Sequence, residues 1–303
     1  MLLFGLMCQP VLPDPPGVVI SHLSPLARRH VGSPALAVLP SGDYVATHDE
    51  FGPGSTEKTV GVTYVFRSSD QGRKWTRTAR IEGAFWSTLF VHRGLLYLLG
   101  TTKEYGSLVI RRSADGGRTW TNPKDGSTGL LRTDFEYHTA PVPVLEHQGK
   151  LWRGVERRDP PEGWGGNFRA GAMSVPAGSD LLEAANWTLT DFLPSDRSWN
   201  GGDMHAWLEG NVAVDPKGKL VNVLRVHTAS MAEKAAIVEL DASGGRLRFD
   251  PVSGFVAFPG GAKKFTIRYD AASKRYWTLA SVVAGPWDGS GSSRPSDPAS
   301  VRN

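Results

Sequence analysis

Short apolar and β-branched runs recur along the chain and are separated by tight turns, most of which contain glycine. In five places two such runs flank a turn, which predicts five antiparallel hairpins. The predicted strand pairs are residues 35–40 with 43–47, 88–92 with 95–100, 142–146 with 150–155, 212–215 with 219–226, and 265–269 with 276–281. Third strands are predicted at 62–67, 109–112, 169–175 and 235–240. Helical periodicity is nearly absent, and only 180–185 is expected to form a short helical turn.

One sequence pattern occurs twice, as SSDQGRKW at residues 68–75 and as SADGGRTW at 113–120. Serine and aspartate side chains bond nearby backbone N–H groups, glycine permits a positive φ, and tryptophan packs a turn onto the next strand. Each copy therefore predicts a hairpin turn and not a catalytic site. A degenerate third copy is expected between Ser179 and Trp187.

The repeated pattern resembles the Asp box of sialidases and related β-propellers, which lies between the third and fourth strands of a blade. Repeats of about 40–50 residues suit four-stranded blades. The resemblance implies an all-β fold, a sialidase-like β-propeller of the six-bladed type with about five blades present. Residues 301–303 look like the start of another strand, so we expect the chain to stop inside its fifth blade. A five-bladed ring closed by the terminal strands is the alternative.

Composition agrees with a β-rich globular protein. The 303 residues are 40% hydrophobic and include 35 Gly, 21 Pro and 10 Trp, which suits a chain with many turns. The net charge is +4, and lysine and arginine are scattered without a basic run, so no nucleic-acid partner is expected. The single cysteine, Cys8, excludes an internal disulfide framework and a cysteine-rich metal site.

The first eight residues, MLLFGLMC, are apolar but lack a basic region and are too short to span a bilayer. We expect no stable membrane insertion. Residues 1–20 are interpreted as an N-terminal segment, either an ordinary start or the remnant of an export signal. A lipoprotein interpretation would make Cys8 the acylated residue. Residues 21–303 are expected to form a single propeller domain, in a secreted, periplasmic or lipid-anchored protein. The sequence indicates no oligomeric state.

The hairpin turns provide a common register for the blades. Counting seven residues past each turn, from Gly42, Gly94, Gly149, Gly218 and Lys274, reaches Asp49, Thr101, Glu156, Arg225 and Ser281. Three of these five residues are charged, and side chains at this position should lie near one mouth of the central channel and meet a ligand there. The alternative is a solvated rim or a set of internal ion pairs.

The first strands of the blades add further candidates, His138, His205, Trp207 and Glu209. The segment from Glu209 to Arg225 is similar to sialidases, in which a glutamate pairs with the tyrosine nucleophile and an arginine grips the sialic acid carboxylate. The resemblance implies these roles for Glu209 and Arg225, and arginine suits the second because it forms two parallel hydrogen bonds. A mutual buried ion pair is the structural alternative.

The chain departs from the sialidase pattern in its first blade. Sialidases supply their first carboxylate-binding arginine there, whereas this chain has Gly32 followed by Ser33 and Pro34. Arg302 resembles the third arginine, and the tyrosine nucleophile would follow beyond the end of the sequence. Asp49, Glu50 and Glu57 compete for the role of the general acid, with Asp49 favoured by its register and Glu57 second.

These candidates predict a glycoside hydrolase that cleaves a terminal sugar, with an acidic sugar as one option. Asp49 is the expected proton donor, and Glu209 the carboxylate at the reacting centre. The expected substrate contacts are Arg225, Arg302, Glu156, His138, His205 and Trp207. No metal or other cofactor is expected. The alternatives are a non-catalytic propeller that binds carbohydrate or protein, and a polysaccharide lyase that uses Tyr137 and His138.

Overall fold

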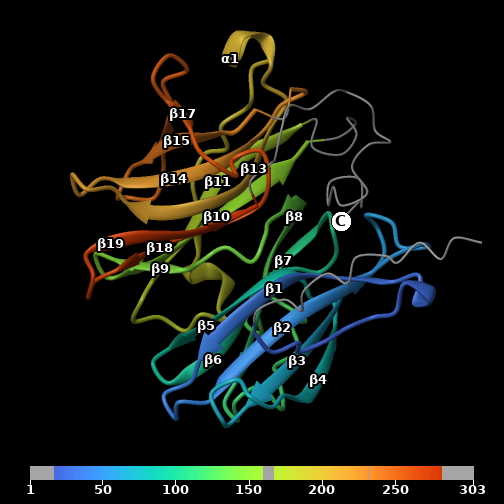
Figure 1. Ribbon diagram of the computed structural model, residues 1–303. Helices are drawn as coiled ribbons and strands as arrows, with labels where there is room; N and C mark the ends of the chain where they lie inside the picture. Colours follow the sequence, from blue (N-terminus) through green and yellow to red (C-terminus); the bar gives the residue numbers. More distant parts are fainter. Residues whose placement is uncertain (1–16, 160–166, 231, 282–303) are drawn as a thin grey trace, which may run out of the picture.

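The computed structural model describes residues 17–159, 167–230 and 232–281. Its first blade is a four-stranded antiparallel sheet that follows the short turn η1 (Pro25–Ala27). The strands lie in sequence order, β1 (His30–Val38), β2 (Tyr44–Phe51), β3 (Val62–Ser68) and β4 (Thr76–Glu82). Blade 1 and the following blade, in blue to green, occupy the lower part of Figure 1.

Blades 2 and 3 share one strand. Blade 2 has β5 (Phe85–His92), β6 (Leu95–Thr101) and β7 (Gly106–Ser113), and blade 3 has β10 (Lys150–Arg158), β11 (Phe168–Pro176) and β12 (Thr188–Leu189). The start of β8 (Leu130–His138) pairs with β7, and its end pairs with β10. β9 (Leu145–His147) pairs with the other end of β10, so β8 and β9 together form the innermost strand of blade 3.

Blade 4 contains β13 (Ala206–Val214), β14 (Leu220–His227) and β15 (Lys234–Leu240), and both β16 (Leu247–Arg248) and β17 (Phe255–Ala257) pair with β15. Blade 5 is described as one hairpin, β18 (Phe265–Asp270) and β19 (Arg275–Ala280). In Figure 1 this hairpin (red) lies between blade 4 and the blue strands of blade 1. The helical elements of the described residues are short, η1, η2 (Ala184–Asn186) and α1 (Trp199–Gly202).

The architecture confirms the expected all-β, sialidase-like propeller of antiparallel blades. All five predicted hairpins and all four predicted third strands form. The helical turn expected at 180–185 is displaced to η2, which begins at Ala184. The innermost strand of blade 3 is interrupted between His138 and Leu145, where Pro141 and Pro143 lack the N–H groups that a continuous strand would need.

The two repeated patterns form the expected hairpin turns. In the first, Gly72 N–H donates to Ser68 Oγ (2.8 Å), Lys74 N–H donates to Asp70 Oδ1 (2.9 Å), and Trp75 Nε1 donates to the Gly72 carbonyl (2.9 Å). In the second, Ser113, Asp115 and Trp120 make the same types of bond. Around Ser179 to Trp187 the turn differs, because Trp187 Nε1 instead donates to the Leu181 carbonyl (2.9 Å).

The hydrophobic core lies between neighbouring blades. Val65 of blade 1 packs with Leu96 and Leu98 of blade 2, while Leu108 and Ile110 of blade 2 pack with Met173 and Val175 of blade 3. Blade 5 packs on blade 4 through Phe265, which joins Val221 and Val223. Because each sheet buries its faces against the next, the inner ends of the strands are held together around one axis.

Candidate functional site

Equivalent inner positions of four blades bring the predicted register residues to one end of the strands. In the innermost hairpins Asp49 pairs with Gly32, Thr101 with Phe85, Glu156 with His138, and Arg225 with Leu208. Asp49, Thr101, Glu156 and Arg225 are all buried. In the fifth blade the counted residue, Ser281, falls just after β19 and is exposed, so the register does not extend to blade 5.

A bulge interrupts the first strand of three blades beside these residues. The pairing shifts between Gly32 and Ala35, between Phe85 and Thr88, and between Leu208 and Asn211. One residue in each bulge has a positive φ, 52° for Ser33, 46° for Trp86 and 54° for Glu209. Side chains other than glycine rarely adopt this conformation, and such strain concentrates at functional sites.

Asp49 is enclosed by neutral hydrogen-bond donors and is only 1% exposed. Thr63 Oγ1 donates to Asp49 Oδ1 (2.5 Å), and the backbone N–H of Trp86 donates to Asp49 Oδ2 (2.7 Å). Burial raises the pKa of Asp49 to about 7, although these hydrogen bonds act in the opposite direction. Asp49 therefore carries a proton for a substantial part of the time near neutral pH.

Glu209 is nearly as buried, at 4% exposed, but it faces cations. Arg225 Nη1 lies 3.4 Å from both carboxylate oxygens, and Lys264 Nζ lies 3.8 Å from Oε1. Burial favours the neutral carboxyl group, but Arg225, Lys264 and His138 outweigh it and lower the pKa of Glu209. Glu209 is therefore ionised near neutral pH, and its pairing with Arg225 realises the predicted buried ion pair.

Glu156 and His138 lie between these two carboxylates and connect blades 3 and 4. Glu156 Oε2 is 2.8 Å from His138 Nδ1, and Glu156 Oε1 accepts a hydrogen bond from Gly210 N–H (3.0 Å). The His138 ring is held between Trp86 and Phe168, with ring centroids 4.5 Å and 4.6 Å away. Both side chains are buried and fix the geometry of the inner strands, so the direct substrate contact expected of them stays a prediction.

Two cationic residues at this end of the strands, Lys264 and Arg153, were not predicted as site residues from the sequence. Lys264 immediately precedes β18, at the start of a first strand, as Glu209 lies near the start of β13. Arg153 is fully buried in β10, and its Nη2 donates to the Ala140 carbonyl (2.7 Å). Burial lowers the pKa of Arg153 to about 9. Two features of the sequence could have indicated these residues. One is a charged residue inside the apolar run of β10, and the other is a pair of lysines directly before β18.

Other predicted site residues lie elsewhere. Trp207 has no exposed surface and packs in the core of blade 4 with Trp199, Phe249 and Phe255, so the expected contact with a sugar is wrong. Its position on β13 directs the ring into the blade, because successive strand residues point to opposite faces. Glu57 is exposed on the loop between β2 and β3. Arg302 lies outside the described residues.

His205 lies at the start of blade 4 beside other basic groups. Its Nδ1 is 2.5 Å from Arg197 Nη1, and its ring lies 5.7 Å from that of His227. Burial, together with Arg225, His205 and Arg197, lowers the pKa of His227 to about 4. His205 is therefore a partly buried residue directly before β13, and both His205 and Arg225 act on His227.

The side chains of the two residues considered for a lyase do not point into the same space. Tyr137 and His138 are adjacent in β8, so their side chains point to opposite faces. The Tyr137 hydroxyl donates to Asp134 Oδ1 (2.7 Å), and burial raises the pKa of Tyr137 above its ordinary value. A tyrosine that resists ionisation is a poor base, which speaks against this chemistry.

Arg29 does not replace the carboxylate-binding arginine that the first blade lacks. Arg29 Nη1 lies 2.8 Å from Glu50 Oε2. Glu50, one of the three residues that compete for the role of the general acid, therefore forms an ion pair with Arg29. The additional cation beside Glu209 is Lys264, which comes from blade 5.

A cavity of about 860 Å³ adjoins the site between blade 1 and blade 5. It follows β1 from Ser33 to Val38 and is bounded on the other side by β18 and the end of β19, while β5 of blade 2 and residues 140–142 of blade 3 also line it. Glu209 and Lys264 line it, whereas Asp49 does not. The ionised carboxylate and the lysine are therefore the charged groups of the site that face open space.

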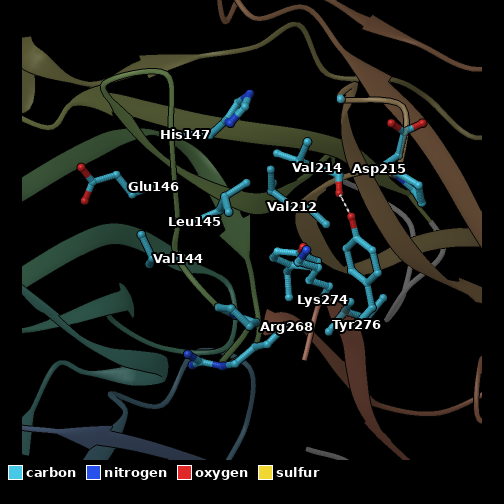
Figure 2. Close-up of a pocket in the computed structure, with 16 residues that line it drawn as sticks. Val144, Leu145, Glu146, His147, Val212, Val214, Asp215, Arg268, Lys274 and Tyr276 are labelled. Atoms are coloured by element: carbon cyan, nitrogen blue, oxygen red, sulfur yellow. Dashed lines mark hydrogen bonds between the residues drawn. The ribbon is translucent and has the colours of Figure 1, made fainter. Parts of the chain in front are cut away.

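A second cavity, of about 870 Å³, lies at the opposite, hairpin ends of the inner strands (Figure 2). It is bounded by β9, β13 and the β18–β19 hairpin. The Tyr276 hydroxyl donates to the Val214 carbonyl and ties β19 to β13, as the dashed line in Figure 2 shows. This cavity contains none of the site residues predicted from the sequence.

Within residues 17–159, 167–230 and 232–281, no group of three or more histidine, cysteine or acidic side chains is arranged to hold a metal ion. The same part of the chain has no helix that is long and apolar enough to cross a membrane.

Comparison with known proteins shows the fold. No family model and no curated protein sequence matches this chain. Among solved structures, a Hadza microbial sialidase superposes with a TM-score of 0.50 and 18% identity over 74% of this chain and 47% of its own. The chain thus spans about half the length of that sialidase.

Two further structures cover more of their own length. A protein of unknown function from Dyadobacter fermentans has a TM-score of 0.52 and 14% identity, over 81% of this chain and 73% of its own. The GH93 α-L-arabinofuranosidase of Fusarium graminearum, solved with arabinobiose, has a TM-score of 0.50 and 11% identity, over 82% and 74%. At these identities the likeness shows that the chain has the sialidase-like propeller fold.

Proposed function

We propose that the protein is a glycoside hydrolase that removes a terminal sugar from a glycan, in its most specific form a sialidase-like enzyme acting on an acidic sugar. One observation carries the proposal. Two buried carboxyl groups at the same end of the propeller have pKa values shifted in opposite directions, Asp49 upwards to about 7 and Glu209 downwards. Glycoside hydrolysis needs one protonated and one ionised carboxyl group, and opposite pKa shifts of this kind support Asp49 as the acid and Glu209 as the carboxylate.

In this mechanism Asp49 gives its proton to the glycosidic oxygen as the bond to the leaving group breaks. Water then adds to the anomeric carbon and gives up a proton that restores Asp49 to its acid form. The Glu209 carboxylate stabilises the positive charge that develops on the sugar ring. Arg225 keeps Glu209 ionised, and the buried Nε of Arg225 has no hydrogen-bond partner among the described residues. The folds of the Hadza sialidase and the Fusarium arabinofuranosidase support a carbohydrate substrate.

A non-catalytic propeller that binds carbohydrate is the second candidate, and one observation favours it. The oxygens of Asp49 and Glu156 are already hydrogen-bonded within the protein, and both residues are buried. In this case the carboxyl groups stabilise the inner strands, and the cavity lined by Glu209 and Lys264 binds a sugar without cleaving it.

The decisive experiment is an activity screen of the full chain on aryl glycosides of terminal sugars, including sialosides, arabinofuranosides and uronides. We expect Asp49→Asn and Glu209→Gln each to lower kcat/KM by about 10²–10⁴-fold on the active substrate. Glu57→Gln is the matched control and should keep nearly full activity, because Glu57 is exposed on a loop. Activity that survives both site substitutions would contradict the proposed roles.

The pH profile provides a second test. Activity requires Asp49 to be protonated, so kcat/KM should fall as the pH rises through about 7, the pKa of Asp49. The acid limb should lie below the ordinary range of a glutamic acid, because Glu209 must lose its proton and its pKa is lowered. An alkaline limb that persists in Asp49→Asn would assign it to another group.

A further inference from the structure

Lys264 is held at the site by backbone contacts from two blades. Asn211, two residues after Glu209, accepts a hydrogen bond from Ile267 N–H (3.2 Å) and donates one to the Phe265 carbonyl (3.4 Å). Ser281 N–H donates to the Lys264 carbonyl (3.4 Å). Because Asn211 is buried, the start of β18 is fixed to the strand that carries Glu209.

The Lys264 ammonium faces the middle of the site. Nζ lies 3.8 Å from Glu209 Oε1 and 5.7 Å from the centre of the Trp86 ring. The side chain is 40% exposed and lines the cavity between blades 1 and 5. Trp86 connects Lys264 with Asp49, because its ring faces Lys264 and its backbone N–H donates to Asp49.

The charges that act on Lys264 come from several blades. Burial lowers the pKa of Lys264, and Arg225 acts in the same direction, whereas Glu209, Asp49 and Glu104 act against it. The interaction is reciprocal, since Lys264 lowers the pKa of both Asp49 and Glu209. Arg225, by contrast, is among the main charges acting on Glu209 but not among those acting on Asp49.

We propose that Lys264 is a positioning residue that couples the two carboxyl groups, because its ammonium lies beside Glu209 and over Trp86, whose N–H binds Asp49. One lysine from blade 5 then contributes to the pH range in which Asp49 donates a proton while Glu209 stays an anion. The catalytic meaning of this coupling rests on the proposed hydrolase function, whereas the coupling itself does not. Removing the positive charge must destabilise both carboxylates, so both groups should titrate at higher pH.

The experiment measures the carboxyl groups directly and needs no substrate. Asp49 and Glu209 are titrated by ¹³C NMR of carboxyl-labelled full-length protein, with spectra of Asp49→Asn and Glu209→Gln to assign the signals. In Lys264→Met both titration midpoints should move to higher pH, and in Lys264→Arg both should stay close to those of the wild type. Arg268→Met is the matched control, because Arg268 lines the same cavity but is not among the main charges acting on either group.

The possible results separate the proposals. Unchanged midpoints in a folded Lys264→Met protein would overturn the coupling, and so would a shift of Glu209 alone. If Lys264→Met does not fold, Lys264→Gln is titrated with the same criteria. Once a substrate is found, both limbs of the pH–rate profile should move to higher pH in Lys264→Met. Shifted midpoints in a protein that hydrolyses no glycoside would leave the coupling intact and count against the hydrolase.

Discussion

The inner ends of blade 1 and blade 4 each carry a carboxyl group that is almost fully buried, yet the two sites favour opposite protonation states. Asp49 meets a threonine hydroxyl and a backbone N–H, whereas Glu209 meets Arg225 and Lys264. Burial penalises the charged form in both places, so the neighbouring charges decide the outcome. The inner ends of two blades therefore hold a carboxyl group that keeps its proton in blade 1 and is ionised in blade 4.

Each site combines a partner from its own blade with a partner from another blade. Thr63 belongs to the same sheet as Asp49, and Trp86 reaches Asp49 from blade 2. Arg225 belongs to the same sheet as Glu209, and Lys264 reaches Glu209 from blade 5. The two sites therefore differ in the charge of their partners, and this difference can be tested by removing one partner at a time.

The largest expected effect concerns Asp49 and the pH dependence of stability. Its pKa is raised from 3.8 to about 7 on folding, so the folded state binds more protons than the unfolded state between these values. The contribution of Asp49 to stability is therefore lost as the pH rises from about 4 to about 7. Relative to the wild type, Asp49→Asn should gain about 4 kcal/mol over this range. Urea unfolding at a series of pH values measures it, and parallel curves would show that Asp49 is not perturbed.

The second effect concerns the cation beside Glu209. Arg225→Met leaves a buried carboxylate with only the more distant Lys264, and should lower the free energy of unfolding at pH 7 by about 3 kcal/mol. The double variant Glu209→Gln/Arg225→Met should recover much of this loss, because no buried charge is left unpaired. Chemical denaturation of the wild type, both single variants and the double variant gives the coupling energy. A coupling energy near zero would mean that the ion pair does not determine the state of Glu209.

A smaller effect is expected at Glu156, which lies between the two regions. Glu156→Ala leaves Gly210 N–H and the His138 ring without their partner, and should cost about 2 kcal/mol. Glu156→Gln keeps an acceptor for Gly210 and should cost less than half as much. Thermal unfolding compares the two variants, and equal losses would exclude the hydrogen bonds as the cause.

The smallest effect is expected at Glu57, which lies outside both regions. Glu57→Gln should change the free energy of unfolding by less than about 0.5 kcal/mol, as for other exposed side chains. Its unfolding should also keep the pH dependence of the wild type between pH 4 and 7. A changed pH dependence would assign part of the behaviour attributed to Asp49 to Glu57.

The fold and the register could be predicted to a large extent from the sequence, because hairpin turns and alternating strands are local features. Counting from Gly42, Gly149 and Gly218 reached Asp49, Glu156 and Arg225, and the structure pairs all three at equivalent inner positions. The same count failed at Ser281, where β19 ends one residue earlier. The prediction that Trp207 contacts a sugar was wrong because the pattern of a strand does not tell which face of a blade forms the core.

The sequence by itself determined the antiparallel blades, the turns that join them and the inner positions of Asp49 and Glu209. Strand period, glycine turns and the repeated Ser, Asp and Trp positions act over a few residues, so they can be read along the chain. Only the tertiary structure decided that Lys264 approaches Glu209 and that Asp49 is hydrogen-bonded by the neutral donors Thr63 and Trp86. Charge interactions depend on distance and burial, and residues 55 positions apart come within 3.8 Å only when blade 5 packs on blade 4.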